Sequence, residues 1–278
     1  MRSIRPLRRS KQAKNKNKTI SAHQASELPV SETQHFRHRP TDHFSPPADH
    51  FSPLVIQQNQ TIARGESTRH AARPSAKLRV LHVGSGIESP TRLHSIFKNP
   101  QWQEIRIDID DDAKPDIAAS VADMQPWIDD ESCDAIWASH VLEHLARHEV
   151  ASALREFRRV LTPSGFALIR SPDVEVVAQF IIEGRIDDVI YTSPAGPITP
   201  LDMLYGHGAS IARGHRAMRH GTAFTQDSLA QDLLSAGFPE VRTTRTETYE
   251  VWAAAFMPAA DVTGILDDLA KTGMDLRS

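Results

Sequence analysis

The chain has 278 residues, 40% of them hydrophobic, and its 32 Lys/Arg and 35 Asp/Glu give a net charge of −3. This length suffices for one domain with a sizeable core plus appendages. A single cysteine, Cys133, excludes an intrachain disulfide and a thiolate cluster built by one chain, which favours a reducing compartment, the cytoplasm. Every apolar run is shorter than the roughly 18–20 residues that span a bilayer, so we expect no membrane partner.

Residues 1–76 differ in composition from the rest. Lys and Arg outnumber Asp and Glu there, apolar periodicity is lacking, and Asp-His-Phe-Ser-Pro occurs at 42–46 and again at 49–53. We therefore predict a disordered extension that is basic and rich in His and Pro. An organelle presequence and a basic arm for nucleic acid are the alternatives. The acidic body opposes nucleic acid, which we do not expect as a partner.

Residues 77–258 alternate strand and helix patterns. A first strand at 78–83 is followed by predicted strands at 105–109, 117–121, 133–138, 166–169, 241–246 and 249–256. Helices are predicted at 91–97, 148–161, 174–182 and 225–234, with a helical tail at 259–278. This order predicts an α/β fold: a doubly wound, mostly parallel, seven-stranded Rossmann-like sheet with a C-terminal antiparallel hairpin.

The first two strand ends carry residues suited to a nucleoside. The turn Gly84-Ser85-Gly86 lets the backbone approach a ligand closely. Some twenty residues later, Asp108 and Asp110 lie near the end of the second strand, where a carboxylate accepts ribose hydroxyls. With the isoleucines at 105, 107 and 109 expected on the packed side of the sheet, both carboxylates share the other face, and Asp108 lies nearer the strand end.

Three passages together resemble the class I S-adenosylmethionine-dependent methyltransferases, especially the small type 11 branch. They are Leu-His-Val-Gly-Ser-Gly at 81–86, Asp-Ala-Ile-Trp-Ala-Ser-His-Val-Leu-Glu-His-Leu at 134–145, and Leu-Arg-Glu-Phe-Arg-Arg-Val-Leu-Thr-Pro-Ser-Gly at 154–165. The resemblance covers roughly residues 78–256. It implies S-adenosylmethionine as the cofactor.

The resemblance also implies a set of cofactor contacts. The glycine turn would wrap the methionine end, Asp108 would hold the ribose, and Asp123 and Met124 would bracket adenine. Ser139 and His140 would line the cofactor cleft. The resulting set of cofactor-binding candidates is Gly84, Ser85, Gly86, Asp108, Asp123, Met124 and Ser139.

Two positions depart from the family pattern. The family usually has an acidic residue two places before the first glycine, where this chain has His82, and a third glycine where it has Glu88. Contact with the methionine ammonium is therefore expected to be rearranged, through Glu88.

The implied activity is methyl transfer, without a metal, to an unidentified acceptor that we expect to be a small molecule. His140, Tyr205 and His207 are the candidate bases. The last two belong to a Gly/Pro/His-rich insertion at 184–221, which is too long for an ordinary connection and is interpreted as a lid over the substrate.

Three other interpretations compete. The principal one is a non-catalytic binding module of the same fold, which His82 and Glu88 motivate. A zinc peptidase is less favoured: His140, Glu143 and His144 spell H-x-x-E-H, although they follow a strand end. A nicotinamide site at the glycine turn is weak, because Ser89 replaces the last glycine of G-x-G-x-x-G.

Overall fold

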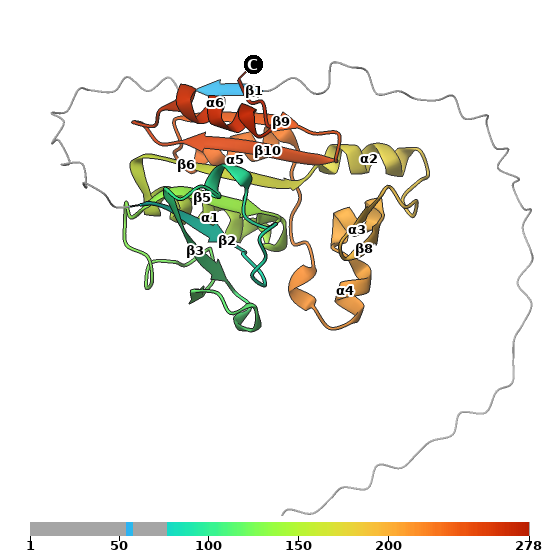
Figure 1. Cartoon of the computed structure of the whole chain (residues 1–278). Helices are drawn as coiled ribbons and strands as arrows, with labels where there is room; N and C mark the ends of the chain where they lie inside the picture. The colour runs from blue at the N-terminus through green and yellow to red at the C-terminus, as the bar shows by residue number, and fades with distance from the viewer. Residues whose placement is uncertain (1–53, 58–76, 278) are drawn as a thin grey trace, which may run out of the picture. The chain divides into compact units, whose positions relative to one another are not determined.

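The computed structural model describes residues 54–57 and 77–277 and shows one large sheet with helices on both faces (Figure 1). Eight strands lie in the order β1-β9-β10-β6-β5-β2-β3-β4. Their bounds are β1 Leu54–Gln57, β2 Leu78–Val83, β3 Trp102–Asp108, β4 Ile117–Ala118, β5 Cys133–Ser139, β6 Leu161–Pro172, β9 Glu240–Arg245 and β10 Glu250–Phe256.

The strand directions confirm the predicted fold class. Strands β4, β3, β2, β5 and β6 pair in parallel, whereas β10 runs antiparallel to both β6 and β9. The chain order reverses between β2 and β5, which lie side by side. In such sheets, ligands bind beyond the carboxyl ends of the strands at this reversal.

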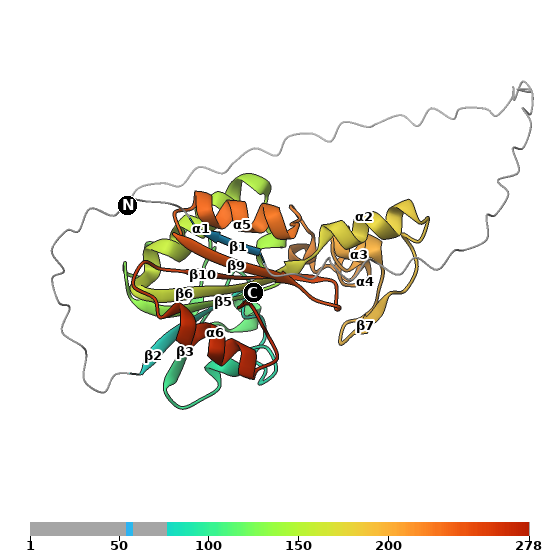
Figure 2. The ribbon, with the colours of Figure 1, turned by 90° about the horizontal axis from the view of Figure 1, so that it is seen from above.

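Two hydrophobic clusters cover the two faces of the sheet. Helices α1 (Arg147–Val160) and α5 (Gln226–Ser235) pack on one face through residues such as Phe157 and Leu233, which are fully buried. Helix α6 (Val262–Lys271) and the short 3-10 helix η2 (Ser95–Phe97) pack on the other (Figure 2). Their apolar faces follow the helical spacing of the sequence, because only one side of each helix meets the sheet.

Strand β1 is the main departure from the predicted organisation. It pairs antiparallel with β9 at the edge of the sheet, and Leu54 and Ile56 pack against the larger cluster. The prediction that residues 1–76 are disordered is therefore wrong for Leu54–Gln57, and the sheet has eight strands instead of seven. The rest of this extension lies outside the described residues.

Two local predictions also differ from the structure. The helix predicted at 91–97 is reduced to η2, which fits the helix-breaking Pro90 before it and Pro100 after it. Strand β3 ends at Asp108, so Ile109 leaves the sheet and its side chain is 71% exposed. The expectation that Ile109 faces the packed side is wrong, because strand alternation stops where the pairing with β4 stops.

The segment between β6 and α5 folds into a small unit with its own core. It contains α2 (Val174–Ile182), the hairpin β7 (Tyr191–Ser193) and β8 (Gly196–Ile198), α3 (Pro200–Tyr205), α4 (Gly208–Ala212) and η5 (Arg216–Met218). We call residues 174–221 the insertion. Val177, Ile198 and Met203 form its core, against which Tyr249 of the β9–β10 turn packs.

A buried ion pair fixes the start of the insertion. Asp173 caps α2, and its carboxylate accepts a hydrogen bond from Arg245 of β9 at 2.5 Å. Both side chains are almost fully buried, so each compensates the desolvation of the other. None of the helices in the described ranges is long and apolar enough to cross a membrane.

The placement of β1 predicts unequal effects for two neighbouring residues. Replacing Ile56 with Ser removes partly buried apolar surface and should destabilise the fold by about 1–2 kcal/mol. For a domain of this size that corresponds to a fall in Tm of roughly 2–8 °C, measured by circular dichroism. Val55→Ser is the matched control, because Val55 is 41% exposed on the same strand. Equal midpoints for the two variants would show that β1 adds nothing to the core.

Candidate functional site

The glycine turn follows β2 and is fastened to the end of β3. Gly84 and Gly86 have φ angles of 60° and 58°, a region that side chains rarely adopt. The backbone N–H of Gly86 donates to Asp108 Oδ2 at 2.7 Å, and Arg106 donates to the Gly86 carbonyl at 2.5 Å. The turn and the carboxylate expected to hold the ribose are therefore parts of one hydrogen-bonded unit.

The carboxylates of Asp108 and Asp110 bind different backbone groups in this unit. Besides binding Gly86, Asp108 accepts a hydrogen bond from the Asp110 N–H through Oδ1 at 2.9 Å. Asp110 instead caps the 3-10 helix η3 (Asp111–Ala113) by accepting from the Asp112 N–H. Each carboxylate oxygen of Asp108 keeps a second lone pair for a ligand hydroxyl.

Ser85 supplies an independent sign that this turn fits a polar ligand. Its side chain is 1% exposed, and its Oγ has no hydrogen-bond partner within the part of the chain that the structure describes. Buried hydroxyls without a partner are costly, and ligands often satisfy them at functional sites. The positive-φ turn, the Asp108 carboxylate and this hydroxyl together fit the polar edge of a nucleoside cofactor.

The residues expected at adenine are separated by the fold. Asp123 is exposed, whereas Met124 is fully buried in the larger cluster, and its N–H donates to Glu156. The Met124 side chain therefore belongs to the core and does not line an open adenine site, because an apolar side chain here gains most by packing under the sheet edge.

The two departures from the family pattern also have distinct positions. His82 is 3% exposed, and its Nδ1 lies 2.6 Å from Glu104 Oε1 on the adjacent strand. Burial lowers the pKa of His82 despite that carboxylate, so the imidazole is neutral at pH 7. Glu88 is an exposed side chain, 3.9 Å from Arg106. His82 carries no carboxylate and the carboxylate of Glu88 is exposed to solvent, so neither position supplies a buried carboxylate beside the glycine turn.

The end of β5 carries Ser139 and His140. Ser139 Oγ accepts a hydrogen bond from Arg170 Nε at 2.8 Å. His140 has a φ of 55°, and this unusual backbone conformation places its ring between two carboxylates. Nδ1 lies 3.0 Å from Glu143 Oε1, and Nε2 lies 2.9 Å from Glu250 Oε1.

These carboxylates fix the charge of His140. Burial by itself lowers the pKa of this imidazole, but the hydrogen bonds to Glu143 and Glu250 outweigh burial and raise it to about 9. Burial likewise opposes ionisation of Glu143, yet the bond to His140 lowers its pKa to about 2. His140 is thus an imidazolium that donates both N–H groups, which argues against its predicted role as a general base at neutral pH.

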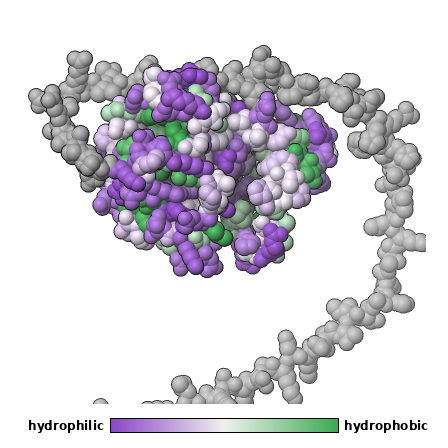
Figure 3. Space-filling view, in the orientation of Figure 1, coloured by the Kyte–Doolittle hydropathy of each residue, from purple (hydrophilic) through white to green (hydrophobic). Residues whose placement is uncertain are grey.

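A cleft of about 670 Å³ lies between these strand ends and the insertion. The surface is recessed where the two meet, and most of the face in this view is hydrophilic (Figure 3). The cleft is lined from β5, β6 and β10 by His140, Arg170 and Glu250, and from the insertion by Tyr191, Met203 and His207, among others. This volume is in the range typical of small-molecule sites.

The two candidate bases in the insertion are placed differently. His207 is 8% exposed, lines the cleft, and its Nδ1 lies 2.8 Å from Ser210 Oγ. Tyr205 ends α3, is 62% exposed and is not among the residues that line the cleft. Of the three predicted bases, only His207 lines the cleft with a ring whose hydrogen-bond partner among the described residues is a hydroxyl and not a carboxylate.

The H-x-x-E-H motif does not form the zinc-peptidase arrangement. His140 ends the β5 segment, and Glu143 and His144 lie on the 3-10 helix η4 (Leu142–His144), so the two histidines are not one turn apart on an α-helix. The three ligating groups that do converge here are Glu143, His144 and His220, the last of which comes from the end of the insertion.

Sequence reasoning missed the partners that complete this site. Glu250 binds His140, although a single glutamate at the start of a hairpin strand carries no recognisable signal. Arg170 lies after a predicted strand and orients Ser139, again without a local pattern. His220 lies in the Gly/Pro/His-rich insertion, where nothing in the sequence distinguishes it from the other histidines. These roles depend on contacts between distant segments.

One segment of the chain matches a known protein family. Residues 81–169 match the family model described as a methyltransferase domain. A search of curated protein sequences gives no match. Solved structures with similar folds include the CMeT domain of the citrinin polyketide synthase, at 16% identity and a TM-score of 0.41, with 66% of this chain and 47% of that chain covered.

Two further similar structures are whole methyltransferases. An S-adenosylmethionine-dependent methyltransferase from Archaeoglobus fulgidus is 15% identical with a TM-score of 0.43, and 65% of this chain and 86% of that chain are covered. The 1,6-didemethyltoxoflavin-N1-methyltransferase of Burkholderia thailandensis is 14% identical with a TM-score of 0.40, with 65% and 71% covered. This chain spans less than half of the polyketide synthase structure.

Residues 81–169 match the methyltransferase family model, and the strand order agrees with the predicted class I fold, so this part of the chain is a methyltransferase domain. Its cofactor is S-adenosylmethionine. The predicted resemblance, the fold class and the cofactor are thereby confirmed, whereas the individual contact residues remain predictions.

Asp108 and Asp110 provide a test of the cofactor contacts. Asp108→Ala should weaken S-adenosylmethionine binding roughly ten- to hundredfold, since it removes a charged acceptor for the ribose hydroxyls and the partner of the Gly86 N–H. Isothermal titration calorimetry measures the change. Asp110→Ala is the matched control, with little effect expected, because that carboxylate caps η3. Equal weakening by both would place the ribose elsewhere.

The charged state of His140 predicts a pH dependence of stability. A histidine with an ordinary pKa of about 6.5 when unfolded and about 9 when folded contributes its full stabilisation below pH 6.5. That stabilisation is lost as the pH rises through 9. In buffer with a chelator, Tm should fall from pH 7 to pH 9.5, and His140→Asn, which tolerates a positive φ, should flatten this slope. Exposed His148→Asn serves as the control. An unchanged slope in His140→Asn would contradict the assignment.

Proposed function

We propose that this protein transfers the methyl group of S-adenosylmethionine to a small-molecule acceptor bound in the cleft between the sheet and the insertion. The cleft is the observation that carries the proposal. It has the volume of a small-molecule site and is lined at one wall by His140, which directly follows the predicted cofactor residue Ser139. An acceptor in this cleft is therefore adjacent to the cofactor end of β5.

Several side chains are arranged to hold the cofactor. The Gly84–Gly86 backbone and the Ser85 hydroxyl would contact its methionine end, Asp108 would accept hydrogen bonds from the ribose hydroxyls, and Ser139, whose hydroxyl binds Arg170, would line its site. Bound S-adenosylmethionine supplies a methyl group on a sulfonium, which is already a strong electrophile. The protein's main contribution is then the alignment of the two reactants, with removal of a proton where the acceptor requires it.

His207 is the proposed base. Its ring lines the cleft, is shielded from bulk solvent, and is oriented through Nδ1 by the Ser210 hydroxyl. His140 has a different role: as an imidazolium held by Glu143 and Glu250, it fixes the wall of the cleft. Tyr205 would take part only if the insertion changed position over the acceptor, which is how a lid acts.

A non-catalytic binding module of the same fold is the second candidate. The buried His82–Glu104 pair and the exposed Glu88 favour it, because neither departure from the family pattern supplies a buried carboxylate beside the glycine turn. The two candidates differ in turnover. An enzyme produces S-adenosylhomocysteine with an acceptor present, whereas a binding module binds the cofactor and produces none.

The test uses the full chain with methyl-labelled S-adenosylmethionine and a fractionated pool of low-molecular-weight metabolites. The label should enter a small-molecule product with formation of S-adenosylhomocysteine. Label in protein or nucleic acid would contradict the proposed acceptor class. Cofactor binding without any transfer would support the binding module.

For the reactive fraction, His207→Gln should lower kcat about 10²–10⁴-fold if the acceptor must lose a proton, while calorimetric affinity for the cofactor stays the same. His215→Gln is the matched control, because His215 is an exposed histidine of the same insertion. Unchanged kcat in His207→Gln would exclude this residue as the base.

A further inference from the structure

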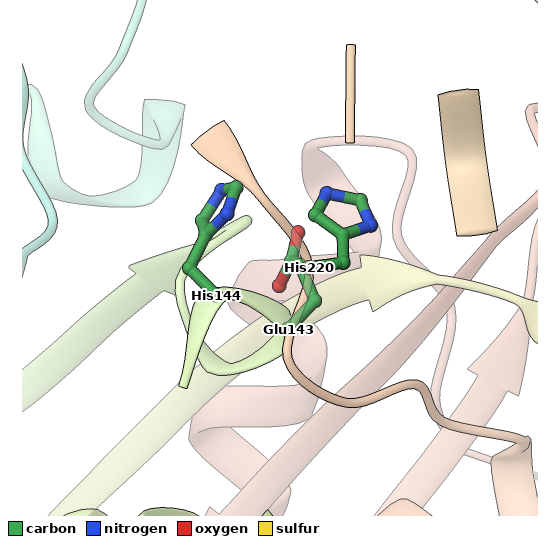
Figure 4. A group of neighbouring side chains, drawn as sticks. All are labelled: Glu143, His144 and His220. Atoms are coloured by element: carbon green, nitrogen blue, oxygen red, sulfur yellow. The ribbon is translucent and has the colours of Figure 1, made fainter. Parts of the chain in front are cut away.

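Three potential metal ligands converge on one wall of the cleft. Glu143, His144 and His220 offer ligand atoms that all lie within 4.8 Å of one another (Figure 4). Glu143 and His144 come from η4, directly after β5, and His220 comes from the segment that follows η5. All three line the cleft, so a small ion has an open route to them.

Hydrogen bonds determine which histidine nitrogens are free to bind. Nδ1 of His144 lies 3.1 Å from the carbonyl of Arg219, and Nδ1 of His220 lies 2.8 Å from the carbonyl of Met203. A carbonyl can only accept, so each Nδ1 carries the proton, and in the neutral ring each Nε2 presents a lone pair. Neither Nε2 has a hydrogen-bond partner among the described residues. Backbone carbonyls in this role are typical of metal-binding histidines.

The carboxylate of Glu143 is held just as firmly. It is 1% exposed, and its oxygens bind His140 at 3.0 Å and the hydroxyl of Ser171 at 2.9 Å. Each carboxylate oxygen has a further lone pair available for a metal. The N–H groups of Gly221 and Thr222 donate to the Glu143 carbonyl at 2.7 and 3.2 Å, so the segment that carries His220 is fixed to η4.

We propose that Glu143, His144 and His220 form a site for one divalent transition-metal ion of the zinc class. Two imidazoles and one carboxylate are a common donor set for zinc when a fourth position stays open to a ligand. Tetrahedral ligands about 2.0–2.1 Å from zinc lie about 3.3–3.5 Å apart. The ligand atoms of the three residues already lie within 4.8 Å of one another, so small side-chain movements bring them to this spacing. This site replaces the sequence-based expectation that the protein holds no metal.

All three ligands line the cleft, which indicates what the ion would do there. It would coordinate an oxygen or nitrogen of the acceptor and orient it within the cleft; this role rests on the proposed function. The metal site itself does not rest on it, because its ligands and their supporting hydrogen bonds are independent of any acceptor.

The test measures zinc binding to the full chain after dialysis against a chelator, without cofactor or acceptor. The wild-type protein should bind one equivalent of zinc more than the variants His144→Ala and His220→Ala. Its Co²⁺ complex should show visible d–d absorption that both variants lack. Histidines outside the described residues add the same background to every variant, so the difference between proteins is the quantity that counts.

His148→Ala and His215→Ala are the matched controls, because both histidines are exposed, one in α1 and one in the insertion. Both controls should bind the same number of zinc equivalents as the wild-type protein. Thermal midpoints check that each variant folds, and His220→Gln replaces any alanine variant that does not. Equal stoichiometry in the ligand variants and the controls overturns the site. Zinc binding with no methyl transfer supports the site and contradicts only the proposed function.

Discussion

The rest of the site depends on the hydrogen bonds that the buried carboxylate of Glu143 makes. Through its side chain it binds His140 at the end of β5 and Ser171 in β6, and through its carbonyl it receives the N–H groups at the end of the insertion. A buried carboxylate is costly unless it is paired, and removing one partner of such a pair typically costs about 3–5 kcal/mol. The need to satisfy this carboxylate holds the charged histidine against the sheet, and the backbone carbonyl of the same residue holds the end of the insertion.

The architecture could be predicted where the information is local. Alternating apolar runs and turn residues were sufficient to place β2, β5, the middle of β6 and the C-terminal hairpin, because each strand carries its own pattern. Strand β1 was missed, since four residues in a polar segment become a strand only by pairing with β9. Ile109 was misplaced for a related reason. The end of β3 is set by its pairing with β4, and the apolar pattern of β3 itself gives no sign of where that pairing stops.

The difference between local patterns and contacts of distant segments also explains which parts of the site could be predicted. The glycine turn and Asp108 follow consecutive strands, and the structure joins them by a hydrogen bond from Gly86. The charge of His140 was not predictable, because it requires Glu250 from the other end of the domain, and this pairing turns a candidate base into a fixed cation. The H-x-x-E-H motif was equally ambiguous, since His220 lies close to Glu143 and His144 in space but far away in sequence.

The anchoring of the insertion limits how it could act as a lid. Its start is fixed by the buried pair of Asp173 and Arg245, and its end by the bonds from Gly221 and Thr222 to Glu143. A motion that opens the whole insertion would have to break one of these two connections, whereas the β7–β8 hairpin and α3 lie between them and share only a small core. Opening of the cleft is therefore expected to involve these inner elements, while the wall that carries Glu143, His144 and His220 stays in place. A metal ion bound to that wall would hold the end of the insertion still more firmly and leave the hairpin as the part free to admit the acceptor.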